Sequence, residues 1–127
     1  MNAVILDHYK LAFHKNYTQL ELLHDAHFNI DDFQFCFDLK LEIYGTTKIG
    51  VLVRRQNFYD TYSFDPMLLL AENGLIEKHA RWIAVVSDKK TDRENLEFIK
   101  YMTTIPCHFF SDSQKAEAFL FRNSYSS

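Results

Sequence analysis

The sequence predicts an α/β fold in which a single-layer mixed β-sheet of about five strands has helices packed mainly on one face. Residues 82–86 (WIAVV) are apolar without alternation, which is typical of a strand that is covered on both faces. From residue 48 onward, strand-like segments alternate with helical ones, which indicates parallel strands with right-handed crossovers. Two strand-like segments at the start form an antiparallel pair, so the expected order is β-β-α-β-α-β-α-β-α.

Length and composition bound the class of protein. A chain of 127 residues suits one domain, so we expect residues 1–127 to form a single domain with loosely ordered ends at 1–8 and 123–127. For residues 1–8, a short strand and a helical turn are also open. With 47% hydrophobic residues, the chain can bury a core. The net charge of −3, without a long basic run, argues against nucleic-acid binding.

The expected location is the cytoplasm. The N-terminus lacks the pattern of a signal peptide. No apolar run approaches the ~20 residues that a membrane span needs, so no transmembrane segment is expected.

The opening segments indicate a hairpin followed by a helix. Residues 9–15 and 18–25 alternate in part, which favours two paired strands. Residues 30–44 then have helical spacing, with Asn29 as a suitable N-cap and acidic residues in the first turn, where the helix dipole favours them. Gly45 can adopt the left-handed backbone that ends a helix.

The helix over residues 30–44 is apolar on two sides. Its main stripe recurs at three- and four-residue spacing and consists of Ile30, Phe33, Phe37, Leu41 and Tyr44. A second apolar ridge consists of Phe35, Leu39 and Ile43. We therefore expect this helix to be covered on more than one side. A homodimer through this helix or through the opening strands is also open.

The middle of the chain combines a buried strand with an aromatic segment. Residues 48–55 (KIGVLVRR) form a strand that ends in two arginines, and residues 56–65 form a loop rich in aromatic side chains. Pro66 suits the first position of a helix that runs to residue 71, because its missing N–H costs nothing there. Residues 75–79 add a further turn before the central strand.

The last third of the chain alternates helix, strand and helix. Leu96, Ile99 and Met102 mark the buried face of one helix, and Ala116, Phe119 and Leu120 mark that of the final helix. Residues 106–110 form a short aromatic strand between the two helices. Thr91 with Glu94, and likewise residues 111–114, match capping boxes at the two helix starts.

Two segments of this last third carry a family resemblance. ARWIAVVSDKK (residues 80–90) has a hydrophobic strand after an arginine. CHFFSDSQKAEAFLF (residues 107–121) follows the pattern F-x-x-x-x-x-A-x-x-[WF]-L, which Phe110, Ala116 or Ala118, Phe119 and Leu120 satisfy. The segments resemble the SpoIIAA-like family, the STAS and SEC14-type domains of bacteria, whereas the first 80 residues match in element order alone. The resemblance implies a mixed sheet with helices mainly on one side, a fold shared by anti-sigma-factor antagonists and SEC14-type lipid carriers.

The resemblance also implies a site of phosphorylation. In the antagonists, a Ser or Thr in a D-S-S-G-like turn at a helix start is phosphorylated. The corresponding residues here are 59–63 (YDTYS), which make Thr61 and Ser63 the candidates. This segment has Asp60 but lacks the serine pair and the glycine, and that departure puts a phosphorylation switch in doubt.

The edge of the sheet where the parallel strands end is the predicted ligand site. Tyr59, Tyr62 and Phe64 of the aromatic loop can wall an apolar pocket there, and Ser87 with Asp88 follows the neighbouring strand at the same edge. The alternative is that the aromatic side chains cap the core of an ordinary loop.

The paired arginines are a second ligand candidate. Arg54 and Arg55 are adjacent on a strand, so they point to opposite faces. One of them can clamp an anionic head group or a phosphate. The alternative is a plain salt bridge with one of the acidic residues.

The sequence carries no catalytic or metal-binding signature. Its three glycines are too far apart for a phosphate-binding loop, and no serine lies in a nucleophile elbow. His24 and His27 have no evident third metal ligand nearby. Cys36 and Cys107 are expected to be buried thiols, although a disulfide stays open. We therefore expect no metal, no cofactor and no enzymatic activity.

Two functions are consistent with these features. The first is a non-enzymatic STAS-like regulatory module that binds a protein partner. The second is a carrier or sensor of a small apolar or amphiphilic, lipid-like ligand in a SEC14-like cleft. A cavity lined by the aromatic side chains of residues 56–65 favours the second.

Overall fold

The computed structural model describes residues 3–6, 9–23, 26–55, 62–64 and 73–125 of the chain. The elements in these ranges, in chain order, are β1 (Ala3–Ile5), β2 (Tyr9–Phe13), β3 (Tyr17–Leu22), β4 (Ala26–Phe28), α1 (Ile30–Tyr44), β5 (Ile49–Arg55), β6 (Tyr62–Phe64), α3 (Asn73–His79), β7 (Ala80–Val86), α4 (Lys90–Met102), β8 (Cys107–Phe110) and α5 (Ser113–Tyr125). The helix predicted over residues 67–71 lies outside the described residues.

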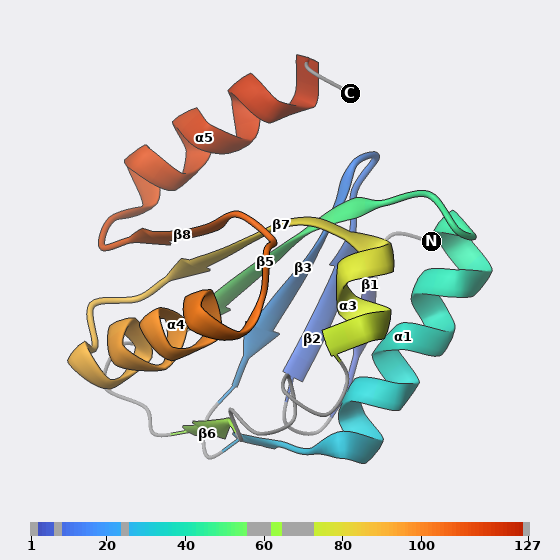
Figure 1. Cartoon of the computed structure of the whole chain (residues 1–127), viewed down its shortest axis with the longest axis horizontal. Coiled ribbons are helices and arrows are strands. Elements are labelled where there is room, and N and C mark those ends of the chain that lie inside the picture. Colours follow the sequence, from blue (N-terminus) through green and yellow to red (C-terminus); the bar gives the residue numbers. More distant parts are fainter. Residues whose placement is uncertain (1–2, 7–8, 24–25, 56–61, 65–72, 126–127) are drawn as a thin grey trace.

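One six-stranded sheet, in the order β1-β2-β3-β5-β7-β8, organises the fold (Figure 1). The pairs β1–β2 and β2–β3 are antiparallel and the pairs β3–β5, β5–β7 and β7–β8 are parallel, which confirms the predicted mixed sheet. β7 lies between β5 and β8, and its residues Trp82, Ile83 and Ala84 are buried. The apolar run at 82–86 is therefore the sheltered strand that the sequence predicts.

Three short strands are missing from the predicted order. β1 extends the sheet to six strands, whereas about five were expected. β4 and β6 pair in parallel in a second, two-stranded sheet, so the prediction of a loop is wrong at residues 62–64. A strand of three residues is too short for alternation to show in the sequence, and pairing with a distant segment decides whether it forms.

The helices cover the two faces of the sheet unequally, as predicted. α1, α3 and α4 lie on one face, which we call the three-helix face, and α5 lies on the other, the α5 face (Figure 1). On the three-helix face, Phe33 and Leu39 of α1 pack against the buried leucines of β2 and β3. Leu96 and Ile99 of α4 pack against Ile83 of β7. These two contacts form separate hydrophobic clusters.

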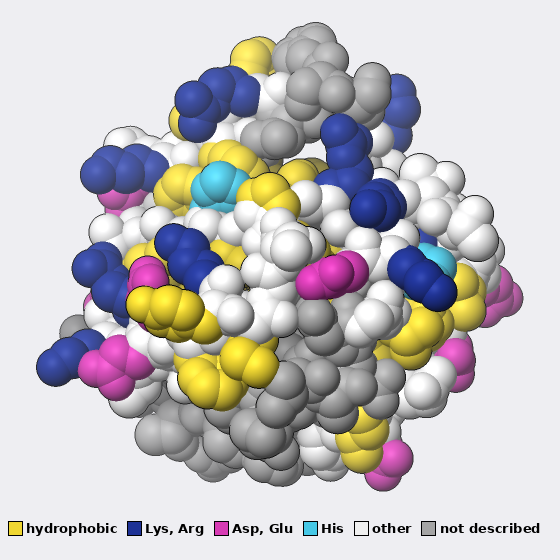
Figure 2. Space-filling model, viewed as in Figure 1, with side chains coloured by type: hydrophobic (Ala, Val, Ile, Leu, Met, Phe, Trp, Pro, Cys, Tyr) yellow, Lys and Arg dark blue, Asp and Glu magenta, His cyan; other side chains and the backbone are white. Residues whose placement is uncertain are grey.

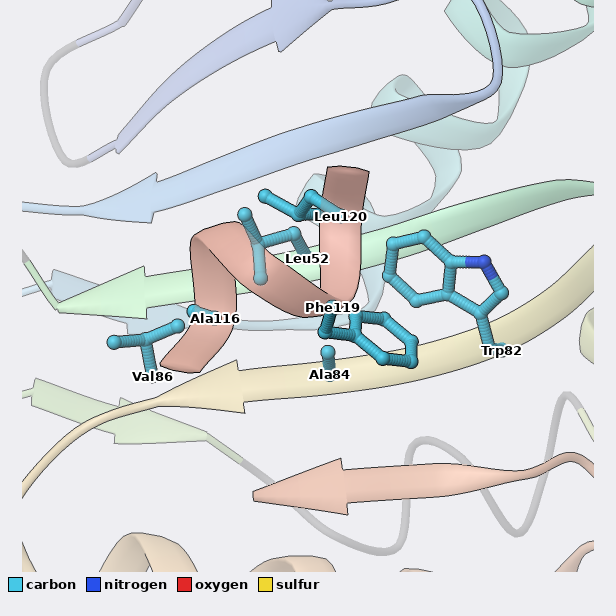
Figure 3. Packing of buried hydrophobic residues seen from close by; sticks show 7 residues of the cluster. All are labelled: Leu52, Trp82, Ala84, Val86, Ala116, Phe119 and Leu120. Carbon is cyan, nitrogen blue, oxygen red and sulfur yellow. The ribbon is translucent and has the colours of Figure 1, made fainter. Parts of the chain in front are cut away.

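α5 seals the centre of the opposite face (Figure 3). Its residue Ala116 is fully buried in one cluster with Leu52 of β5. Phe119 meets the Trp82 indole edge to face, with ring centroids 4.9 Å apart. The indole in turn lies over Gly50, where an added Cβ would come within 2.1 Å of the ring. The close approach of Trp82 therefore requires a glycine at position 50.

α1 begins and ends as the sequence predicts. The side chains of Asn29 and Asp32 accept each other's backbone N–H at 3.0 Å, which completes a capping box. Gly45 ends the helix with a positive φ of 64°. The predicted stripes are only partly buried. Leu39 of the second ridge packs against the core. Phe35 and Ile43 of that ridge are 41% and 48% exposed, and Ile30 and Leu41 of the main stripe are 46% and 40% exposed. The chain by itself therefore covers α1 on one side.

The predicted capping residues of α4 and α5 are wrong by two residues and by one residue, respectively. α4 begins at Lys90, and its N-cap is Lys89, whose side chain makes no capping hydrogen bond, so Thr91 is inside the helix. Before α5, the carboxylate of Asp112 accepts the Lys115 N–H at 2.8 Å and takes the role predicted for the preceding serine. Before α5, several capping residues stand in a row, and the sequence alone does not rank them. At α4 the N-cap is a lysine, which is not a preferred capping residue, so the capping rule does not point to it.

Candidate functional site

An apolar cavity of about 200 Å³ lies on the three-helix face. α1 packs over β2 and β3, and α4 packs over β7, so the strand between them is covered incompletely. Val51 and Val53 of that strand, β5, are half-buried and line the cavity. Further apolar lining residues come from both helices and the flanking strands; they include Leu11, Leu20, Phe33, Phe37, Ile83, Leu96 and Ile99. The separation of α1 and α4 thus leaves a hollow above β5.

One end of the cavity carries a buried lysine. The Lys40 ammonium, on the inner face of α1, donates to the Gly45 carbonyl at 2.6 Å and lies 2.8 Å from His79 Nδ1. Because the ammonium only donates, Nδ1 accepts, and this assigns the His79 proton to Nε2. Burial lowers the pKa of Lys40, and burial together with the nearby Lys40 lowers the pKa of His79. This end is therefore basic and poorly solvated.

The other end carries a buried carboxylate. Ser87, the residue after β7, is fully buried, and its hydroxyl donates a short hydrogen bond to Asp92 of α4. The same hydroxyl accepts the Lys89 N–H at 3.0 Å. Asp92 and Asn95 both line the cavity. Since His79 precedes β7 and Ser87 follows it, the two polar ends are roughly 25 Å apart along the strand.

Two further polar side chains line the cavity. The Thr18 hydroxyl oxygen is buried next to the Tyr44 hydroxyl, but it makes no hydrogen bond of standard geometry to a described residue. Thr18 lies near the lysine end. The Tyr44 hydroxyl, one helical turn after Lys40, donates a hydrogen bond to the carbonyl of Tyr17, which directly precedes Thr18. Burial raises the pKa of the Cys36 thiol to about 12, so this cysteine is protonated at neutral pH and is no ready nucleophile.

Comparison with known proteins bears on the fold. No family model and no curated protein matches the chain. A solved structure does match it: an uncharacterized protein of the DUF3478 family from Shewanella loihica PV-4, with a SpoIIAA-like fold, superposes with a TM-score of 0.59 over 94% of each chain, at 12% sequence identity. The fold is SpoIIAA-like. The resemblance predicted from the last third is thus confirmed as a fold, and it extends over nearly the whole chain.

Several predicted site residues of this SpoIIAA-like chain have no described side chain. Tyr59 and Thr61 lie outside the described residues. The backbone of Tyr62, Ser63 and Phe64 forms β6, which pairs with β4 rather than with the six-stranded sheet. Arg55 ends β5, and its side chain is likewise outside the description. The aromatic pocket and the phosphorylation site therefore stay predictions.

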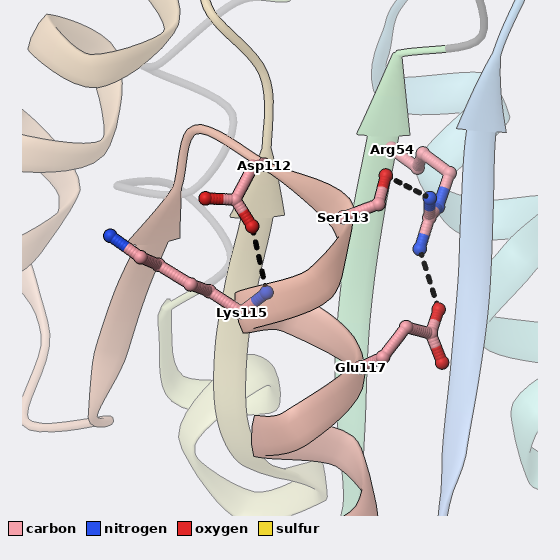
Figure 4. Close-up of polar contacts among 5 residues, drawn as sticks. All are labelled: Arg54, Asp112, Ser113, Lys115 and Glu117. Atoms are coloured by element: carbon pink, nitrogen blue, oxygen red, sulfur yellow. Dashed lines mark hydrogen bonds and ion pairs between the residues drawn. The ribbon is translucent and has the colours of Figure 1, made fainter.

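The remaining predicted site residues do not lie in the cavity lining. Ser87 bonds inward to Asp92, and Asp88 beside it is exposed. Arg54 lies on the α5 face, where its guanidinium donates to Ser113 Oγ and to Glu117 Oε1, both at 3.3 Å (Figure 4). The salt-bridge alternative for Arg54 is therefore confirmed.

The sequence analysis missed the polar residues of the cavity. Lys40, His79 and Asp92 line it, and none of them belongs to a motif. A signal was present for Lys40, which follows Phe33 and Phe37 at helical spacing and so interrupts the apolar stripe of α1 with a charge. His79 and Asp92 stand at element ends, where polar residues are common and carry little information.

The surface of the three-helix face has exposed apolar side chains over α1 and α4 (Figure 2). Those of α1 include Phe35, Leu41 and Ile43, and those of α4 include Phe98 and Tyr101. None of the described helices has both the length and the hydropathy needed to cross a bilayer. Among the described residues, no three His, Cys, Asp or Glu side chains gather as metal ligands do.

Proposed function

We propose that this chain is a non-enzymatic module that binds a small apolar or amphiphilic ligand in the cavity of the three-helix face. The cavity above β5 is the observation that supports the proposal. Ligand sites in proteins are typically concave and apolar, with a few polar groups that fix the ligand's orientation. The Lys40 and Asp92 ends supply such groups at either end of an apolar lining.

The volume of the cavity sets the size of the ligand. An engineered apolar cavity of ~150 Å³ binds benzene. At about 200 Å³, this cavity suits a somewhat larger apolar group, such as a short acyl chain or a substituted ring. Arg54 is engaged by Glu117 on the α5 face, which favours the three-helix face as the better candidate.

Native mass spectrometry tests the proposal. Protein purified under non-denaturing conditions is expected to carry a small molecule, or to take up octanol when it is added. The variant Val51→Phe fills the cavity, so it is expected to lose the ligand while its stability stays the same or rises.

Leu52→Phe is the matched control. Leu52 is the next residue of β5, points to the α5 face and is fully buried there. The added ring has no space, and overpacking is expected to cost about 1–3 kcal/mol. Equal destabilisation by both variants, or unchanged ligand uptake by a folded Val51→Phe protein, would count against a ligand-binding cavity.

A protein partner is the second candidate function. The observation that favours it is the second ridge of α1, where Phe35 and Ile43 are 41% and 48% exposed. Exposed apolar patches are often interaction sites. The double variant Phe35→Ser, Ile43→Ser is expected to retain its fold and to lose a partner that co-purifies with the native protein from its host. A co-purifying partner that the variant retains would exclude this ridge, and the opening strands would then be the candidate surface.

Regulation by phosphorylation at Thr61 or Ser63, and a cytoplasmic location, are part of the same proposal. The support for phosphorylation is the position of residues 59–63 after β5, which corresponds to the phosphorylated turn of the antagonists. A phosphate-affinity gel of the protein from its own host is expected to show a shifted band. A single unshifted band would remove phosphorylation from the proposal.

A further inference from the structure

We infer that the ligand of this cavity is an amphiphile with a carboxylate head, bound with the head at Lys40 and Thr18 and with the apolar chain above β5. This inference rests on the proposed function, because it names the chemical class that the same cavity takes. It depends on the contacts of Lys40, on the charge of the opposite end and on the number of cations that line the cavity.

The contacts that Lys40 makes with the described residues include no anion. The side chain is buried, and its two hydrogen-bond partners, the Gly45 carbonyl and His79 Nδ1, are neutral acceptors. No carboxylate among the described residues forms an ion pair with it. Buried charges in proteins are usually paired, because an unpaired one loses its hydration without compensation. A ligand carboxylate at this end would supply the missing partner through a charge-assisted hydrogen bond.

Thr18 adds a second polar contact at the same end. Its buried hydroxyl oxygen lines the cavity, and its polar neighbour is the Tyr44 hydroxyl, with which it makes no hydrogen bond of standard geometry. Buried hydroxyl groups are normally hydrogen-bonded. A hydroxyl can donate to one oxygen of a carboxylate while the Lys40 ammonium donates to the other. Two donors in the same part of the cavity suit the two oxygens of a carboxylate.

The opposite end fixes the direction of the ligand. Asp92 lines the cavity there and already accepts the Ser87 hydroxyl. A ligand carboxylate at that end would stand close to a second carboxylate and be repelled. The head group therefore belongs at the Lys40 end, and the chain runs past Val51 and Val53 toward α4.

The lysine and arginine content of the described lining favours a monoanion. Among the described lining residues, Lys40 is the one lysine or arginine, and its ammonium lacks the fork of a guanidinium. Phosphate groups carry close to two charges and are typically held by arginines or by several donors. A carboxylate needs one cation, so it matches this lining better than a phosphate does.

Isothermal titration calorimetry with chain-matched probes tests the inference on the native protein. Octanoate, octanol and octyl phosphate share one apolar chain and differ in the head. Octanoate is expected to bind about tenfold more tightly than octanol, as a charge-assisted hydrogen bond implies, and more tightly than octyl phosphate. Lys40→Met is expected to remove the preference by weakening octanoate about tenfold, with octanol binding unchanged.

A second variant covers the case in which Lys40→Met does not fold. Thr18→Val keeps the shape of the side chain and removes the hydroxyl, so it is expected to weaken octanoate a few-fold and to leave octanol unchanged. Equal affinities for octanoate and octanol on the native protein would overturn the carboxylate assignment and leave the ligand-binding proposal standing. Tighter binding of octyl phosphate would assign the head to a phosphate instead and overturn the inference. Absence of binding by all three probes would overturn both.

Discussion

Replacing Gly50 tests the packing that holds the centre of the sheet. In Gly50→Ala, the new Cβ would come within 2.1 Å of the Trp82 ring, far inside van der Waals contact. The indole cannot retreat freely, because the Phe119 ring lies against it at a centroid distance of 4.9 Å. A single methyl group at this position must therefore shift the indole, or the strand, or both.

The expected size of the effect follows from two opposing terms. Overpacking a core by one methyl group costs about 1–3 kcal/mol. Replacing a glycine restrains the unfolded chain and so stabilises the folded state by about 0.4–1 kcal/mol. The net loss is about 1–2 kcal/mol. For a chain of this length, each kcal/mol lowers Tm by about 3–5 °C.

Urea unfolding, followed by far-ultraviolet circular dichroism, measures this loss. Gly74→Ala is the matched control: Gly74 is exposed on α3, and an added Cβ there meets no atom within 4 Å. That variant is expected to gain about 0.5–1 kcal/mol. In a Trp82→Phe background, the smaller ring leaves space, so the cost of Gly50→Ala is expected to fall by about 1 kcal/mol.

Two results would refute this reasoning. Gly50→Ala could prove as stable as Gly74→Ala, which would mean that the indole does not lie over position 50. Alternatively, Gly50→Ala could cost as much with Phe at position 82 as with Trp, which would assign the cost to the backbone rather than to the indole.

Three further predictions concern the polar contacts. Asp92→Ala removes the partner of the buried Ser87 hydroxyl, so it is expected to lower the free energy of unfolding in urea by about 1–3 kcal/mol. Thr91→Ala is the control. It is expected to change stability by less than about 0.5 kcal/mol, because Thr91 does not cap α4. Glu117→Gln removes an ion pair whose carboxylate is 66% exposed, so a loss below about 1 kcal/mol that shrinks further in high salt is expected. The pKa of His79 is lowered in the fold, chiefly by burial, so protonation is easier in the unfolded chain and stability is lost as the pH falls below about 6.5. The variant His79→Gln lacks the titrating group and therefore lacks this loss. As the pH falls from about 7 to about 5, the urea midpoint of the native protein is expected to fall relative to that of the variant. Parallel pH profiles of the two proteins would contradict the burial of His79.

The fold was predictable from the sequence where the pattern of side chains extends over many residues. The run at 82–86, the stripe of α1 and the alternation in β3 each span several residues, and all three elements form as predicted. β4 and β6 have three residues each and depend on each other across a separation of more than thirty residues. No local pattern can carry that information, so these strands were missed.

The candidate site was predictable only in part, because it is a gap rather than a motif. The cavity arises where α1 and α4 diverge over β5, and the sequence does not record the distance between two helices. Arg54 illustrates the same limit. The strand pattern predicts that Arg54 and Arg55 point to opposite faces of the sheet, but the position of Glu117 on α5 decides that Arg54 forms an ion pair. Lys40 was the one residue of the site with a usable signal, a charge within an apolar stripe.

Methyl-labelled NMR tests the central claim most directly, because it reports where a ligand binds. On addition of octanoate, the methyl resonances of Leu11, Ile83 and Leu96, which line the cavity, are expected to shift. Those of Leu52 and Val86, which are buried on the α5 face, are expected to stay in place. Shifts confined to the α5 face, or no shifts at octanoate concentrations far above those of a specific site, would contradict a ligand-binding cavity between the sheet and its three helices.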